Sequence, residues 1–222
     1  MLFSKPPPDL PKVTSPKAAP VCEKSKPSPE GKALLKPDMT PPQYLHSLKE
    51  NKMSVDSVHF LAHGLPPPDA ICWAVQACRL VAPKLSPIEL DALKLTEAWL
   101  KLPAPNLMAS ISVAVPKCDF TGPAGWAGQA ALWIAIPSLV AAAVAGAILL
   151  AAGLKVGVAM PPIPQLKIPL PMVPLTPEFL LKLPKLPPPP PIPVLDQPKL
   201  MKLLLPFIEL GIAVAMGKVR CC

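Results

Sequence analysis

The sequence predicts an all-α fold, in which a compact multi-helix domain is followed by a proline-rich extension in polyproline II conformation and a C-terminal helix. Three observations lead to this prediction. Apolar residues recur at helical spacing through the middle of the chain. Prolines and capping residues stand where these runs begin, as they do at helix N-termini. The one strand-like alternation, at Ile111, Val113 and Val115, has no evident strand partner.

Composition divides the 222 residues into four parts. The 37 prolines are denser on both sides of residues 41–153 than within them, so this block is predicted to be the folded helical domain. Residues 1–40 contain too few apolar residues to offset the chain entropy lost on folding, and a disordered arm is expected. Removal of residues 1–36 is expected to cost little stability. Residues 154–198 form the proline-rich extension, and residues 199–222 a C-terminal helix and tail.

The net charge of +8 comes from the flanks, because the seven Lys and Arg residues of the middle block balance its seven Asp and Glu residues. The lysines of the flanks stand singly between prolines and leucines, without aromatic residues clustered among them. A nucleic-acid-binding surface needs such a cluster or a groove-reading helix. No nucleic-acid partner is therefore expected.

Two short helices are expected at the start of the middle block. The first follows Thr40 and two prolines and places Tyr44 and Leu48 on one face. The second begins with Ser54 as its cap and ends before the three prolines at 66–68.

Two longer amphipathic helices follow. One is expected to begin at Asp69, and the other has a capping box formed by Ser86 and Glu89 with a proline at its first helical position. The apolar stripe of the first helix is Ala70, Trp73, Ala74, Ala77 and Leu80. The residues of the second helix that are expected to face inward are Ile88, Ala92, Leu95 and Trp99. The next stretch, "APNLMASISVAVPK", is also predicted to be helical.

Residues 120–154 carry no charge, and this run is longer than the roughly 20 residues that span a bilayer. Two interpretations follow. In a packed core, alanines and glycines let helices approach while Trp126 and Trp133 fill the remaining volume. A membrane-associated protein would instead insert residues 138–154. The packed core is favoured, with Trp99, Trp126 and Trp133 as its signature, because alanine contributes little to membrane insertion.

Residues 161–198 combine closely spaced prolines with leucine, isoleucine, valine and methionine. Such a segment favours an extended polyproline II strip whose apolar side chains need a surface to cover them. It is predicted to pack on the helices or on a protein partner, and the final helix is expected to bend at Pro206. The candidate partner-binding residues are Pro187, Pro188, Pro189, Pro190, Pro191 and Trp73. Trp73 is included because aromatic side chains line proline-binding grooves.

No constellation of residues predicts a chemical reaction. His59 and His63 have the spacing of half a metal site, but no third ligand is evident nearby. A pair of His46 with Cys72 or Cys78 as nucleophile lacks any sign of a lowered thiol pKa. The sequence therefore predicts no catalytic, cofactor-binding or metal-binding residue, no cofactor, and a protein that is not an enzyme.

The six cysteines include no Cys-x-x-Cys pair, and the N-terminus has no apolar signal region. Reduced thiols and a cytoplasmic location are expected. Cys221 and Cys222, beside Lys218 and Arg220, have an alternative interpretation as a lipid-attachment site. That alternative would place the protein at the inner membrane.

Four stretches match, in order, the blocks of a known kind of domain. They are "PPQYLHSLKENKMSVDSVHFLAHGLPPPDAICWAVQACR", "ALKLTEAWLKLPAP", "GPAGWAGQAALW" and "AVAGAILLAAG". Together they resemble a family of bacterial all-helical domains of unknown function over residues 41–153. The order of the blocks is more specific than any single block.

The chain departs from the family pattern at two places. It has Pro66, Pro67 and Pro68 where the family tends to have an arginine, and the stretch from Ile134 to Ser138 replaces a Gly-Gly-Ser loop. The resemblance implies no catalytic residue and a likeness to accessory proteins encoded near bacterial type VI secretion clusters. The expected function is that of a non-enzymatic, adaptor-like protein that binds a protein partner in a secretion or envelope machine. The alternative is a membrane-associated protein.

Overall fold

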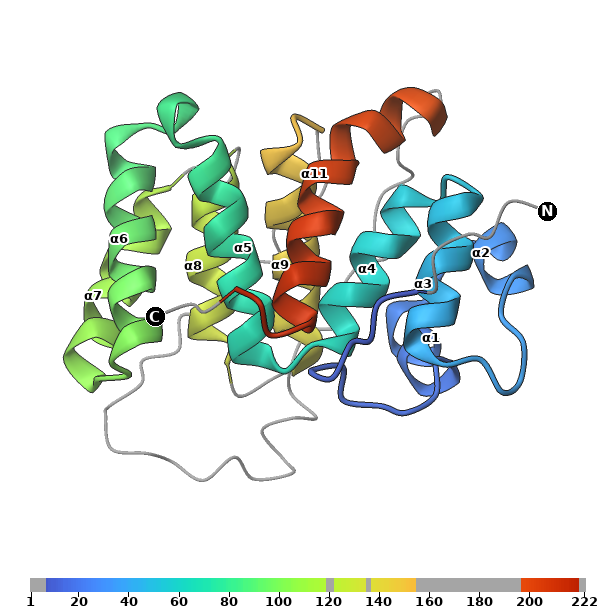
Figure 1. Ribbon diagram of the computed structural model, residues 1–222. Coiled ribbons are helices and arrows are strands. Elements are labelled where there is room, and N and C mark those ends of the chain that lie inside the picture. The colour runs from blue at the N-terminus through green and yellow to red at the C-terminus, as the bar shows by residue number, and fades with distance from the viewer. Residues whose placement is uncertain (1–6, 119–121, 135–136, 155–196, 220–222) are drawn as a thin grey trace. The chain divides into compact units, whose positions relative to one another are not determined.

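The computed structural model of the chain describes residues 7–118, 122–134, 137–154 and 197–219. Within these ranges every regular element is helical and no strand is present, so the all-α prediction is confirmed (Figure 1). The α-helices are α1 (Ala19–Ser25), α2 (Pro29–Ala33), α3 (Pro41–Glu50), α4 (Ser54–Gly64), α5 (Pro67–Leu80), α6 (Pro87–Lys101), α7 (Pro105–Ala114), α8 (Pro123–Leu132), α9 (Pro137–Ala151) and α11 (Gln197–Ala215), and the 3₁₀ turns are η1 (Ala82–Lys84) and η2 (Val115–Lys117). The described helices belong to one compact unit.

Prolines and polar side chains determine where the helices begin. Ser86 and Glu89 form the predicted capping box: the Glu89 N–H donates to Ser86 Oγ at 3.3 Å, and the Ser86 N–H donates to Glu89 Oε2 at 3.1 Å. α5 begins two residues earlier than predicted. Pro66 is its N-cap, and Pro67 and Pro68 occupy the first turn, where the missing N–H groups would have no partner within the helix.

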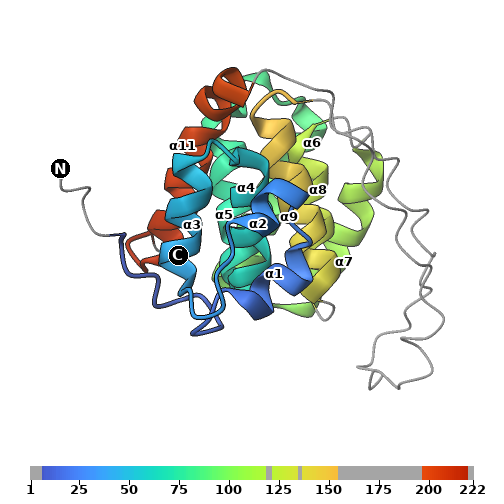
Figure 2. The same ribbon diagram turned by 90° about the vertical axis from the view of Figure 1, so that its right-hand side faces the viewer.

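α9 lies at the centre of this unit, where it contacts α4, α5 and α8 (Figures 1 and 2). Its small side chains allow these close contacts. Gly146 faces the indole of Trp126, and a Cβ at this position would lie 2.7 Å from Trp126 Cε3. The buried alanines of this helix are Ala141, Ala143, Ala145, Ala147 and Ala151. The small residues of α9 therefore pack against other helices, as the packed-core interpretation predicts.

The apolar helices α9 and α11 do not have the properties of a membrane span. α9 has 15 residues, fewer than the roughly 20 that cross a bilayer. α11, with 19 residues, carries Lys199, Lys202 and Glu209 along its length. Across the described ranges, no helix is both long enough and apolar enough to span a membrane.

The segment before residue 41 packs against the helices, which contradicts the predicted disorder for residues 7–40. Backbone hydrogen bonds tie it to distant elements: the Thr14 N–H donates to the Gly64 carbonyl at 2.9 Å, and the Lys12 N–H to the Ala215 carbonyl at 3.1 Å. The apolar residues that it contributes to the core are Leu10, Ala18, Val21 and Cys22. The prediction from composition is wrong here, because a few apolar residues are enough to order a segment when they pack into a core formed by the rest of the chain.

α11 confirms the predicted C-terminal helix and packs on α4 and α5. Pro206 lies inside it, and the helix axis changes direction along its length (Figure 1). Gly211 lets α11 approach α5, because a Cβ there would lie 2.7 Å from Cε2 of Trp73. On the other side, Glu209 forms an ion pair with Lys49 of α3.

Two predictions concern residues outside the described ranges. One is the polyproline II conformation of residues 161–196, which include the run from Pro187 to Pro191. The other is lipid attachment at Cys221 and Cys222. Residues 197 and 198, which composition assigns to the extension, belong instead to α11.

Candidate partner-binding groove

Trp73 is not available to a ligand, contrary to its predicted role in a proline-binding groove. Its side chain is 0% exposed, and its Nε1–H donates to the Phe207 carbonyl at 2.8 Å. The backbone of α11 therefore lies against the indole that a proline-rich ligand would have to reach. Phe207 is 134 residues away along the chain, so no local pattern could reveal this contact.

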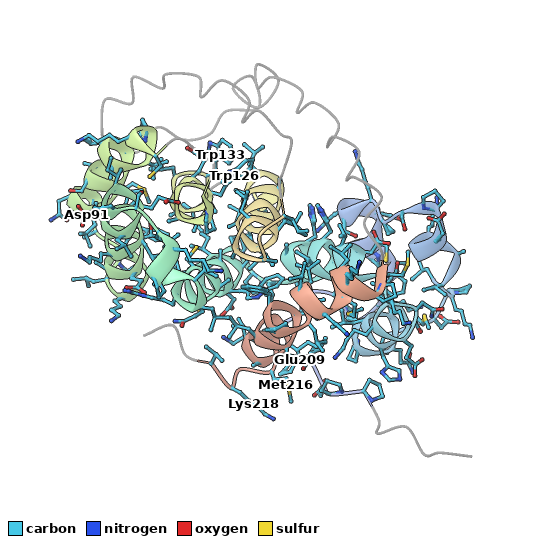
Figure 3. All side chains as sticks on the ribbon, turned by 90° about the horizontal axis from the view of Figure 1, so that it is seen from above. Asp91, Trp126, Trp133, Glu209, Met216 and Lys218 are labelled. Atoms are coloured by element: carbon cyan, nitrogen blue, oxygen red, sulfur yellow. The ribbon has the colours of Figure 1, made fainter. Side chains whose placement is uncertain are left out.

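The other three tryptophans lie on α6 and α8. Trp99 and Trp126 are buried, Trp126 between α8 and α9. Trp133 is only partly buried, contrary to its predicted place in the core, because α8 ends at Leu132 and Trp133 is its C-cap. Figure 3 shows Trp126 and Trp133 on the same side of the helices.

A groove with a volume of about 630 Å³ lies on the surface between α6 and α7. Its lining residues are Ile88, Asp91 and Leu95 of α6, Ala109, Ser110, Val113 and Ala114 of α7, and Lys117 of η2. Most of these side chains are apolar, and none is aromatic. The groove was not predicted from the sequence.

α7 has two different faces. Ile111 is buried, and so is Val115, which packs on α8 where a Cβ at Gly128 would lie 2.5 Å from Val115 Cγ2. The opposite face carries Ala109 and Val113, and Val113 is 61% exposed. No residue from 102 to 116 is charged, so this exposed face has no charged side chain of its own.

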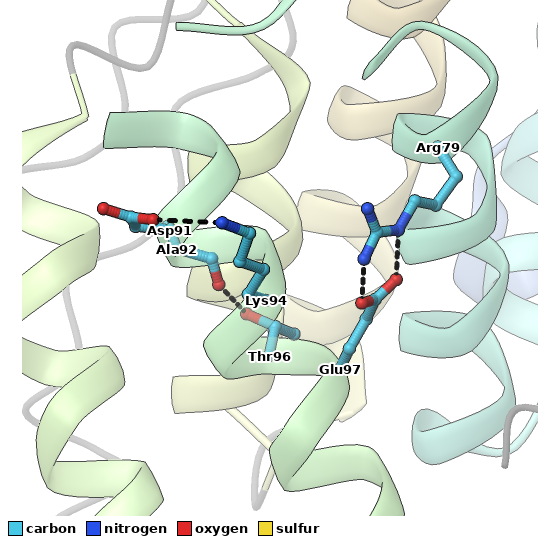
Figure 4. A network of polar contacts seen from close by, with 6 residues as sticks. All are labelled: Arg79, Asp91, Ala92, Lys94, Thr96 and Glu97. Carbon is cyan, nitrogen blue, oxygen red and sulfur yellow. Dashed lines mark hydrogen bonds and ion pairs between the residues drawn. The ribbon is translucent and has the colours of Figure 1, made fainter. Parts of the chain in front are cut away.

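Buried side chains and an ion pair with α5 fix the position of α6 on the side away from the groove. Ala92, Leu93 and Thr96 are buried, and Thr96 Oγ1 donates to the Ala92 carbonyl at 2.8 Å (Figure 4). The Arg79 guanidinium of α5 donates two hydrogen bonds to the Glu97 carboxylate (Figure 4). Such a bidentate pair fixes the geometry of the two helices as well as joining them.

Ile88 and Leu80 are exposed, although helical spacing predicts that both belong to inward-facing stripes. Ile88 is 49% exposed at the first turn of α6, and Leu80 is 58% exposed at the last residue of α5. Helical spacing identifies the apolar face of a helix, but it does not show how much of that face the neighbouring elements bury. At Ile88 the apolar stripe of α6 extends beyond the part of the helix that other described elements bury. This exposed end of the stripe forms part of one wall of the groove.

Opposite charges stand at one end of the groove. The short linker at 102–104 makes α6 and α7 antiparallel neighbours, so Asp91, near the start of α6, and Lys117, just after α7, lie at the same end. Asp91 lies 3.6 Å from Lys94 Nζ (Figure 4), and Figure 3 shows it at the outer edge of α6. Lys117 forms no ion pair with any residue of the described ranges.

A family model matches residues 44–159, just over half of the chain. The family is one of unknown function, DUF6931. The chain belongs to this family. Comparisons with curated proteins and with solved structures give no match. Membership of an uncharacterised family is thus confirmed, and α4 to α9, with the whole groove, lie inside the DUF6931 region.

His59 and His63 lie on α4 in the DUF6931 region, and burial favours their neutral forms. Burial lowers the pKa of His59, with Asp56 acting in the opposite direction. The pKa of His63 is lowered to about 4, mainly by burial and in addition by the nearby His59, Lys24 and Lys26. In the part of the chain that the structure describes, no group of three His, Cys, Asp or Glu residues could hold a metal ion.

The His63 environment predicts a specific acid sensitivity. Between about pH 6.5 and about pH 4 the unfolded chain binds a proton at His63 that the folded protein does not, so stability falls as the pH drops through this window. The variant His63→Gln is expected to lose less stability over this window than the wild type. Urea unfolding at several pH values measures the difference. Parallel curves for the two proteins would contradict the prediction.

The cysteines of the DUF6931 region do not form the nucleophile pair considered from the sequence. Burial raises the pKa of Cys78, which disfavours the thiolate, and His46 Nε2 lies 3.0 Å from Glu50 Oε1. Cys72 is disulfide-bonded, so the expectation of reduced thiols does not hold there. Cys22, Cys78 and Cys118 are buried.

Proposed function

We propose that this protein is a non-enzymatic, adaptor-like interaction protein that binds a protein partner through the groove between α6 and α7. The observation that carries the proposal is the exposure of apolar side chains on both walls, Ile88 on one and Val113 on the other. Apolar side chains gathered around a hollow mark contact sites, whereas singly scattered ones are ordinary. A partner that covers these side chains gains the hydrophobic free energy of their burial.

The cellular setting is part of the same proposal. The order of the sequence blocks resembles bacterial helical domains that are similar to accessory proteins of type VI secretion clusters. We therefore propose a cytoplasmic accessory of a bacterial secretion or envelope machine. The proline-rich segment, with the run from Pro187 to Pro191, is a second partner-binding element of this proposal on the basis of its sequence.

Site-specific photocrosslinking of the full-length chain in its native cells tests the proposal. A photoreactive amino acid at Val113 is expected to give a discrete covalent adduct with another protein. The matched control carries the same amino acid at Leu80, which is as exposed as Val113 but does not line the groove. Absence of an adduct at position 113, or equal adducts at both positions, would refute binding at the groove.

A further inference from the structure

We infer that the element bound in the groove between α6 and α7 is an amphipathic α-helix of the partner, with a carboxylate placed to pair with Lys117. This inference rests on the proposed function, because it names the partner chemistry of the same groove. It depends on three features of the lining: the helical spacing of the residues, the exposed apolar walls, and the cation at one end.

The lining favours a helical occupant. The α6 residues 88, 91 and 95 recur at helical spacing, and so do residues 109 and 113 of α7 with residue 117 of the η2 turn that continues it, along two antiparallel neighbours. The ridges of two such helices leave a groove into which the ridge of a third helix packs. A polyproline ligand instead docks on aromatic side chains, and none of the residues that line this groove is aromatic.

The two walls provide apolar anchor points for such a helix. Ile88 and Val113 are exposed, and Leu95, which also lines the groove, is half-buried. A leucine or another large apolar side chain of the partner, placed every three or four residues, covers these side chains as it packs. The face of α7 that lines the groove has no charged residue before Lys117, so the apolar contact is uninterrupted along it.

The charges at the end of the groove favour an acidic helix over a basic one. Asp91 already has Lys94 as a counter-ion at 3.6 Å. Lys117 has no counter-ion among the described residues. A partner carboxylate near Lys117 therefore gains an ion pair without displacing one, whereas a lysine at the same place would face an unpaired like charge.

Two synthetic peptides of about 18 residues, or about five helical turns, test the inference. They share one leucine face, and their polar faces are rich in glutamate in one peptide and in lysine in the other. Fluorescence anisotropy measures their binding to the full-length protein. The glutamate peptide is expected to bind about 2-fold to 5-fold more tightly than the lysine peptide, the difference expected from one exposed charge pair.

Two pairs of variants locate the binding. Lys117→Glu is expected to reverse the preference between the peptides, while Lys84→Glu, which makes the same change in net charge on η1 outside the groove, keeps it. Val113→Asp is expected to lower the affinity for both peptides about 10-fold, whereas Leu80→Asp is expected to leave the affinity for both unchanged. Circular dichroism checks that each variant is folded. Equal affinity for the two peptides, or equal effects of the Lys117 and Lys84 variants, would overturn the inference.

The two proposals fail in distinguishable ways. If Val113 gives a specific protein adduct but neither peptide binds up to about 1 mM, the groove is an interface and the helical, acidic partner is wrong. If the peptides bind as expected but no adduct forms in cells, the groove chemistry stands and the proposed cellular function fails. Mass spectrometry of an adduct adds a direct check, because a crosslinked segment that is not an acidic amphipathic helix overturns the inference.

Discussion

Replacing Trp73 with alanine is expected to lower the free energy of unfolding by about 4 to 5 kcal/mol, the upper part of the range for a buried tryptophan. The indole is fully buried, and it lies against Gly211 of α11 and donates a hydrogen bond to the Phe207 carbonyl. Truncation removes the contacts of the ring and leaves that carbonyl without its indole donor. Urea unfolding of the full chain at neutral pH measures the loss.

Two variants separate the parts of this effect. Trp73→Phe keeps an aromatic ring but removes the Nε1–H donor, and it is expected to cost about 1 to 2 kcal/mol. Trp133→Ala removes a tryptophan that is only partly buried at the C-cap of α8, and a loss below about 2 kcal/mol is expected. If Trp133→Ala destabilised the protein as much as Trp73→Ala, burial between α5 and α11 would not be the source of the effect.

Helix starts were the most predictable part of this fold, because their signals are local. Ser86 and Glu89 are three residues apart, and their side chains can satisfy each other's backbone N–H groups only at a helix N-terminus. Proline at the first helical position strengthens the same signal. The three prolines at 66–68 show the limit of this reasoning, since their sequence predicts the end of one helix and the structure shows that they also begin the next.

Burial was harder to predict, because it depends on elements far apart in the chain. Trp73 is covered by a helix that begins more than a hundred residues later, and Ile88 is exposed because no element of the described ranges covers its side chain. Helical periodicity describes one helix at a time and holds no information on its neighbours. The groove has a weaker sequence signal: a helix from 105 to 114 without any charged residue lacks the polar face of an ordinary surface helix.

Removing residues 1–36 is expected to lower the melting temperature by more than about 10 °C, since 1 kcal/mol shifts it by about 2 to 4 °C in a chain of this size. Leu10, Val21 and Cys22 are buried, and each such side chain contributes about 1 to 3 kcal/mol before the entropy of ordering the segment is subtracted. The deletion also removes the Gly31 carbonyl that accepts the Tyr44 hydroxyl at 2.9 Å in the core. Differential scanning calorimetry measures the shift.

Point variants in the full chain show whether the loss of stability on deletion comes from the packing of the segment on the helices. Val21→Ala is expected to cost about 1 to 2 kcal/mol, because it removes buried methyl groups on α1. Lys17→Ala removes an exposed ion pair with Asp38 and is expected to change stability by less than about 0.5 kcal/mol. A disordered arm would give an unchanged melting temperature for all three proteins. A loss on deletion that Val21→Ala partly reproduces and Lys17→Ala does not is the result expected only if the segment is packed on the helices.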